Sequence, residues 1–193
     1  MKGGWLLSRL GATRTMAGNN ELRRWRGLRG ARHHRIGRSP LIVRDGVVMD
    51  SRLAMQVTVG DYFAQHRAGH EGECVLQVVD AATETVRRHN LILAMMEADG
   101  VLLVRHPKTQ TMYSSGWRPA SVNACTAGAA VKSTHITGEG GDLYDPEGKL
   151  DAWCLMHQDK LQEVGLWLED PQSTVRWCHL DRKQRANRIF KIK

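Results

Sequence analysis

The chain has 193 residues, of which 41% are hydrophobic, and this size suits one domain of ordinary dimensions with an extension. The formal net charge of +8 is unevenly distributed. Residues 1–40 carry ten Lys or Arg and one acidic residue, whereas residues 41–193 carry eighteen basic and nineteen acidic side chains. The near-neutral body gives no electrostatic reason to bind a polyanion, so nucleic acid is not an expected partner.

Targeting and redox signals are weak. No segment has the ~20 consecutive apolar residues of a membrane span. The longest apolar run near the N-terminus, residues 5–7, is too short for a signal-peptide core, so we expect synthesis in the cytoplasm. The cysteines are widely spaced without a C-x-x-C pair, which argues against a zinc ribbon or a disulfide framework and favours buried, reduced thiols. They are Cys74, Cys125, Cys154 and Cys178.

The composition divides the chain into residues 1–50, a basic extension, and residues 55–193, a folded domain. Residues 1–40 are rich in arginine and glycine and poor in large apolar residues, which predicts disorder. The extension is either a cationic arm that attracts cell-wall polymers, membrane or nucleic acid, or a solvated tail. An over-extended translation start is a further alternative, because Met16, Met49 and Met55 follow.

In chain order, residues 41–54 predict a short extended segment with a hairpin around residues 45–46. Thr58 is expected to cap a short helix. Residues 74–98 have apolar side chains at three- and four-residue steps, which predicts a helix ended by Gly100, with His89 in a packing or surface role. Residues 101–104 predict a short buried strand, and residues 113–117 a strand that enters a turn at Arg118.

The second half begins with a small-residue loop or helix over residues 120–130. Residues 145–148 predict a turn. Helical spacing over residues 150–164 predicts one helix that ends at Gly165 and carries His157 in a structural or exposed role. Residues 166–168 predict a strand, and the final segment, 182–193, is expected to cover a sheet edge through Ile189 and Phe190.

Two His and one Asp predict a metal site. The segment S-T-H-I-T-G-E-G-G-D, residues 133–142, places His135 and Asp142 seven positions apart, or ~10 Å along a helix. Zinc ligands lie about 2 Å from the ion, so the glycines indicate a turn leading into a strand instead. The period-two pattern W-C-H-L-D, residues 177–181, presents His179 from a second strand. Three ligands with one open position are typical of a catalytic zinc site.

These two segments, together with S-S-G-W-R-P at residues 114–119, resemble the zinc D-alanyl-D-alanine peptidases. That group includes vancomycin-resistance carboxypeptidases, phage L-alanyl-D-glutamate endolysins and the related hedgehog signalling domain. The resemblance has three blocks that span residues 114–181, and it extends more loosely from about residue 55 to the C-terminus without covering the first fifty residues. It implies His135, Asp142 and His179 as ligands of Zn²⁺ and Arg118 as the substrate clamp. Ser115 and Trp117 are assigned to substrate binding as well, although core packing is the favoured role for Trp117.

Two departures from the family pattern stand out. Gly140 replaces a common alanine, and Arg176 stands three residues before His179, where related enzymes often carry a catalytic glutamate. We therefore assign the base to Glu169, which follows the strand predicted at residues 166–168. Asp170, Asp181 and Glu139 remain rivals, and Asp181 could instead orient a ligand.

Together these features predict a single α+β domain: a small antiparallel sheet carrying the zinc, with helices packed on one side. The expected function is hydrolysis of peptide bonds in peptidoglycan stem peptides by a monomer, in carboxypeptidase or endopeptidase mode. A phage or prophage origin would let it act on the cell wall after release or as a virion component. The alternatives are a catalytically inactive zinc-containing module that binds peptidoglycan or another ligand and, third, a nucleic-acid-binding protein that uses the arginine arm.

Overall fold

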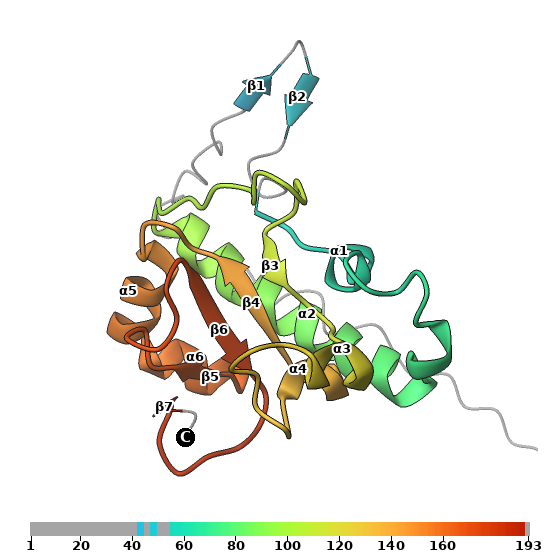
Figure 1. The fold of residues 1–193 in the computed structure, drawn as a ribbon. Helices are drawn as coiled ribbons and strands as arrows, with labels where there is room; N and C mark the ends of the chain where they lie inside the picture. Colours follow the sequence, from blue (N-terminus) through green and yellow to red (C-terminus); the bar gives the residue numbers. More distant parts are fainter. Residues whose placement is uncertain (1–41, 45–46, 50–54, 192–193) are drawn as a thin grey trace, which may run out of the picture. The chain divides into compact units, whose positions relative to one another are not determined.

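A computed structural model describes residues 42–44, 47–49 and 55–191 (Figure 1). The prediction of disorder for residues 1–40 lies outside the described residues. Strands β1 (Ile42–Arg44) and β2 (Val47–Met49) pair antiparallel, which confirms the predicted hairpin. No helix in the described part of the chain is both long enough and apolar enough to cross a membrane.

The domain is α+β and is built on a five-stranded sheet with the order β3-β4-β6-β5-β7. Its strands are β3 (Tyr113–Ser115), β4 (Gly140–Tyr144), β5 (Trp167–Glu169), β6 (Trp177–Asp181) and β7 (Ile189–Phe190). The prediction of a purely antiparallel sheet is wrong, because β7 pairs parallel to β5. Strand β6 already pairs with β4 and β5, and the chain that leaves it reaches the outer edge of β5. There Ile189 and Phe190 cover the edge, as predicted.

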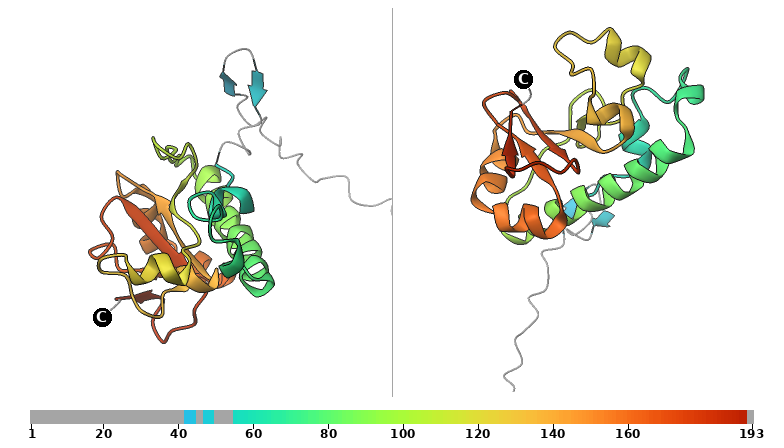
Figure 2. Two further views of the ribbon diagram at one scale, coloured as in Figure 1. Left: turned by 45° about the vertical axis from the view of Figure 1, so that its right-hand side comes forward. Right: turned by 90° about the horizontal axis from the view of Figure 1, so that it is seen from below.

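Three helices cover one face of this sheet: α2 (Leu76–Ala98), α5 (Lys149–Met156) and α6 (Gln158–Val164) (Figures 1 and 2). Helix α2 confirms the predicted helix, starts two residues later than expected and is followed by Gly100 at φ +78°. Its buried stripe packs toward the sheet and includes His89, whose packing role is thereby confirmed. The stripe consists of Ala82, Thr85, Val86, His89, Ile92, Leu93 and Met96.

Two predicted elements differ from the structure. The helix expected over residues 150–164 is broken at His157, which has φ −120° and ψ 48°. The His157 Nδ1 atom lies 2.8 Å from the Trp153 carbonyl oxygen, and its ring stacks on the Trp153 ring, so local contacts end α5 there. Residues 101–104 form no strand, and no described strand pairs with this segment. Leu102 and Val104 are 46% and 49% exposed, so the segment is not buried as predicted.

Three short helices flank the sheet. Helix α1 (Val59–Phe63) begins at Thr58, which forms a capping box with Asp61, as the sequence predicts. Helix α3 (Ala120–Ala124) opens the small-residue segment. Helix α4 (Thr134–Thr137) is a single turn capped by Ser133 and ended by Gly138, after which the chain enters β4. The glycine-rich segment is thus a helical turn followed by a strand.

Gly138 joins α4 to α2 at close range. It has φ +78°, a left-handed conformation that favours glycine. A Cβ atom at this position would lie 2.6 Å from the Val78 carbonyl oxygen in α2. The Gly138 carbonyl also accepts a hydrogen bond of 2.8 Å from Thr85 Oγ1. The turn that carries His135 is therefore packed directly on the long helix.

We expect Gly138→Ala to lower the free energy of unfolding by about 2–4 kcal/mol, from left-handed strain and overpacking together. Gly128→Ala is the matched control, since Gly128 has φ +74° but no atom within 4 Å of the position that a Cβ atom would take. The control should lose only about 1 kcal/mol, from backbone strain. Urea denaturation of the two variants measures the difference, and equal losses would contradict close packing at Gly138.

Candidate metal centre

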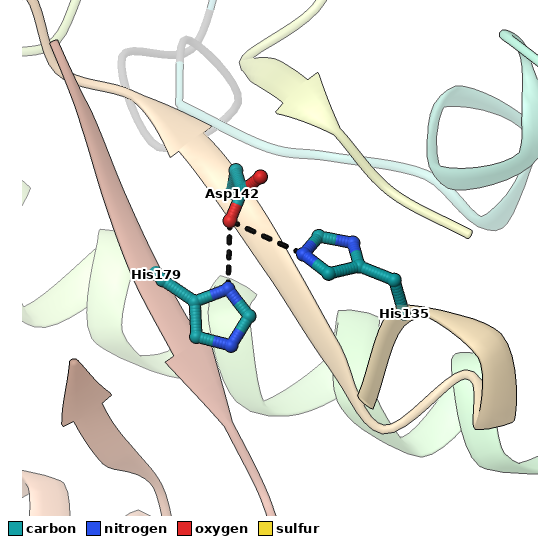
Figure 3. A group of neighbouring side chains, drawn as sticks. All are labelled: His135, Asp142 and His179. Atoms are coloured by element: carbon teal, nitrogen blue, oxygen red, sulfur yellow. Dashed lines mark hydrogen bonds and ion pairs between the residues drawn. The ribbon is translucent and has the colours of Figure 1, made fainter. Parts of the chain in front are cut away.

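His135, Asp142 and His179 come together on the sheet face opposite α2 (Figure 3). They lie on α4, β4 and β6, and one nitrogen or oxygen atom of each lies within 4.8 Å of the others. Asp142 and His179 are direct partners in the β4–β6 pairing, so their side chains leave the sheet on the same face. All three residues are buried. The structure thus places together the three residues that the sequence predicts as ligands.

His135 is held in one orientation by the backbone. Its Nδ1 atom donates a hydrogen bond of 2.6 Å to the Gly116 carbonyl oxygen. Its Nε2 atom consequently faces Asp142 Oδ1 at 3.3 Å. The Arg118 backbone N–H also donates to the His135 carbonyl oxygen, at 3.2 Å. The S-S-G-W-R-P segment and the turn that carries His135 are therefore joined by hydrogen bonds in both directions.

His179 lies between two carboxylates. Its Nδ1 atom is 2.6 Å from Asp142 Oδ1, and its Nε2 atom is 3.5 Å from Asp181 Oδ2. Asp181 is fully buried and forms a bidentate ion pair with the Arg185 guanidinium. Asp181 thus orients His179 from behind, which is the second role that the sequence left open for it. Sequence reasoning missed Arg185, although its spacing of four from Asp181 was visible.

The electrostatics of the group follow from these contacts. Burial alone would lower the pKa of His179, but hydrogen bonds to the Asp142 and Asp181 carboxylates outweigh it and raise the pKa to about 10. Burial alone would raise the pKa of Asp142, yet His135 and His179 hold it well below its usual range. The pKa of Asp181 is also lowered against its burial, by His179 and Arg185. The group therefore combines an ionised carboxylate with a protonated imidazole.

The donor set fits a divalent transition-metal ion. Two imidazole nitrogens and a carboxylate oxygen are ligands that zinc accepts, and each His has its other nitrogen engaged by a carbonyl or carboxylate oxygen. Ligands about 2 Å from a tetrahedral ion lie roughly 3.3 Å apart. The His135–Asp142 separation of 3.3 Å meets this spacing, whereas the 2.6 Å between His179 and Asp142 is a hydrogen bond that must lengthen.

The site opens into a cleft of about 1290 Å³. Ser115 and Arg118 line this cleft, and Arg118 donates hydrogen bonds of 3.3 Å to Ser115 Oγ and to Asn123 Oδ1. Trp117 does not line it. Its side chain is 1% exposed, packs against Phe63 and donates to the Ile136 carbonyl oxygen. Trp117 is thus a core packing residue, which is the role that the sequence favoured over substrate binding.

Among the candidate bases, Glu169 is the one that faces the cleft without a hydrogen-bonding partner in the described part of the chain. Burial raises its pKa, with the Asp142 charge adding to the effect and His179 opposing it. Asp181 is committed to Arg185. Asp170 pairs with Lys191 at 3.0 Å, and Glu139 accepts a hydrogen bond from Thr137.

Comparisons of the chain with protein-family models, curated proteins and solved structures found no match. The resemblance to zinc peptidases therefore remains a prediction from the motif residues. The geometry adds that the residues of all three motif segments meet at one cleft.

Zinc binding should release about one proton per ion at pH 7, because a His179 pKa of about 10 leaves Nδ1 protonated in the metal-free chain. Apparent zinc affinity should rise about tenfold per pH unit from pH 6 to 9. Calorimetry in buffers of different ionisation enthalpy counts the released proton; no release would contradict a protonated His179.

The raised pKa of His179 also makes the stability of the metal-free chain depend on pH. The contribution of His179 to the free energy of unfolding is complete below pH 6.5 and is lost as the pH rises through about 10.

Proposed function

We propose that the chain is a zinc metallopeptidase that hydrolyses peptide bonds of peptidoglycan stem peptides. The observation that carries the proposal is the buried His135, Asp142 and His179 group, with both imidazoles pre-oriented, on the wall of a cleft that also presents Arg118 and Glu169. Three ligands leave a tetrahedral ion with one position for water or substrate. The motif resemblance supplies the substrate class.

The residues divide the chemistry among themselves. Zinc held by the three ligands would supply a Lewis acid that polarises a carbonyl and makes water more acidic. Glu169 would take a proton from the attacking water on its carboxylate and return it to the leaving amine. Its raised pKa brings it closer to neutral pH, where a group that both accepts and donates a proton works best.

Arg118 would bind a substrate carboxylate through its planar guanidinium. Its two side-chain hydrogen bonds go to neutral oxygens, of Ser115 and Asn123, so they leave its positive charge unneutralised. Ser115 would therefore hold the clamp in position, and the charge would remain available to substrate.

A zinc-containing binding module without turnover is the second candidate. Arg176, which occupies the position of a common family base, lines the same cleft. Retained zinc with no hydrolysis of any peptide, unchanged by substitution of Glu169, would favour this binding module. The third possibility, binding of nucleic acid by the arginine arm, concerns residues outside the described part of the chain.

Elemental analysis of the purified chain should find about one zinc, and His179→Ala should lose it, because two ligands bind zinc much more weakly than three. Lys160→Ala, a change on the surface pair Lys160–Glu163, is the control that should keep its zinc. Zinc-loaded wild type should then digest peptidoglycan fragments. A folded wild type without zinc, even after incubation with the metal, would remove the peptidase proposal at its root.

Glu169→Gln should retain zinc and lose at least about 100-fold in turnover, since the amide cannot accept the water proton. Its free energy of unfolding at pH 7 should be unchanged or higher, because the substitution removes a buried carboxylate whose pKa is raised. Asp170→Asn serves as the control for a neighbouring carboxylate already paired with Lys191. Near-normal turnover of zinc-loaded Glu169→Gln would reject Glu169 as base, and loss in Asp170→Asn would move the assignment there.

A further inference from the structure

The cleft gathers positive charge that the sequence spreads over distant segments. Seven Lys or Arg side chains line it, against two carboxylates, Asp142 and Glu169. Two of the seven, Arg185 and Lys191, pair with Asp181 and Asp170. In the described part of the chain, the other five have no carboxylate within ion-pairing distance: Lys108, Arg118, Lys132, Arg176 and Lys183.

Four of these free cations lie toward the two ends of the β4–β6 pair, whereas Arg118 donates a hydrogen bond to Ser115, which pairs with Asp142 near the centre. Asp142 faces His179 at its centre, Tyr144 faces Trp177 at one end, and Gly140 faces Asp181 at the other. The four steps from residue 177 to residue 181 span about 13 Å. Positive charge at both ends therefore brackets the metal site.

At the Tyr144 end, Arg176 directly precedes β6. The His106 ring packs edge-on against the Tyr144 ring with centroids 4.7 Å apart, which brings the segment with Lys108 to the same end. Trp177, which is 37% exposed, also lines the cleft here. This end therefore offers two cations and one accessible aromatic ring.

At the Asp181 end, Lys183 follows β6, and its backbone N–H donates to Asp181 Oδ1 at 3.2 Å. The Lys183 side chain is exposed and lines the cleft. Lys132, also exposed, lines the cleft just before α4. The charge at this end thus comes from two segments about fifty residues apart in the chain.

Arg176 has a second unusual property. It adopts φ +75°, a left-handed conformation that costs a non-glycine residue about 1 kcal/mol. The hydrogen bond from the Asp145 N–H to the Arg176 carbonyl oxygen, 3.0 Å long, holds this conformation. Its side chain is exposed and lines the cleft. The strained backbone thus presents a free cation beside the site.

We infer that the cleft selects an extended acidic peptide with carboxylates about two or three residues to each side of the bond placed at the metal site, given a rise of ~3.4 Å per residue. This inference rests on the proposed peptidase function and deepens it. Positive charge at both ends favours cleavage inside a chain, because a carboxypeptidase requires a carboxylate on one side only. The carboxylates of Asp142 and Glu169 line the same cleft and disfavour a nucleic acid, which carries a negative charge at every nucleotide.

The test measures binding separately from turnover. Three labelled peptides of about eight residues share a central D-alanyl-D-alanine pair. They differ only at the third residue on each side of the bond in that pair, where the first carries Glu, the second Gln and the third Lys. Fluorescence anisotropy gives their affinities for the zinc-loaded, full-length Glu169→Gln chain, and mass spectrometry verifies that the peptides stay intact. The Glu peptide should bind about tenfold more tightly than the Gln peptide at ~50 mM salt, with the advantage fading at ~0.5 M.

Charge-reversal variants test whether the cationic side chains of the cleft cause the preference for the Glu peptide. Lys183→Glu, alone and with Arg176→Glu, should reduce the advantage of the Glu peptide to about twofold or less. Lys149→Glu and Lys160→Glu change the net charge equally on surface pairs outside the cleft and should preserve it. The single Lys183 variant keeps the test valid if substitution at the strained Arg176 impairs folding, which thermal unfolding monitors.

Three results would overturn the inference: equal binding of the Glu and Gln peptides, an advantage that survives reversal of Lys183, or tighter binding of a single-stranded oligonucleotide than of the Glu peptide. Cleavage assays of the zinc-loaded wild type distinguish failure of the proposed selectivity from failure of the proposed peptidase function. Cleavage of the Gln peptide as fast as the Glu peptide would keep the peptidase and reject the selectivity. Preferential binding of the Glu peptide without cleavage of any peptide would keep the selectivity and reject the peptidase.

Discussion

The site depends on the pairing of β4 with β6, which places Asp142 directly opposite His179. A slip of one residue would turn one of the two side chains toward the helix-covered face and separate them. Close packing opposes such a slip. A Cβ atom on Gly140 would lie 2.3 Å from Thr134 Oγ1, and the Tyr62 hydroxyl donates a hydrogen bond of 2.6 Å to the Gly140 carbonyl oxygen.

Helix α2 supports the same pair of strands from behind. His89 is fully buried, and its burial lowers its pKa to about 4, so the ring is neutral at pH 7. A neutral ring can donate through Nε2 to the Leu180 carbonyl oxygen, 3.2 Å away, and accept from the Tyr113 hydroxyl, 2.8 Å away. His89 thus fixes the backbone between His179 and Asp181. His179 itself is protonated, because it lies between the Asp142 and Asp181 carboxylates.

The third candidate ligand, His135, lies on a helix and not on a strand of the sheet. This helix is a single turn, and the His135 ring is oriented by the Gly116 carbonyl oxygen. Gly116 approaches α1 so closely that a Cβ atom would lie 2.0 Å from the Tyr62 carbonyl oxygen. Tyr62 therefore contacts both Gly116, whose carbonyl oxygen orients His135, and strand β4, which carries Asp142. Because Tyr62 is buried in the core, the candidate metal ligands are part of the folded domain.

Several features were determined by the sequence alone, because they depend on local spacing. Helical periodicity predicted α2, the glycine-rich segment predicted a turn before β4, and period-two alternation predicted the strand of His179. Helix breaking at His157 escaped prediction, because a side-chain contact to Trp153 ends a pattern that otherwise continues. The parallel pairing of β7 escaped as well, since it depends on which sheet edge remains free.

The tertiary structure alone decided how charge is distributed around the ligands. Net charge describes the body as near neutral, yet folding brings Lys108, Lys132, Arg176 and Lys183 to one cleft. It also decided that Asp181 is bound by Arg185 while Glu169 is left facing the cleft. Electrostatic interaction depends on distance in space and on burial, and neither follows from distance along the chain. The sequence therefore determined the candidate ligands, whereas the packing of distant segments determined their electrostatic surroundings.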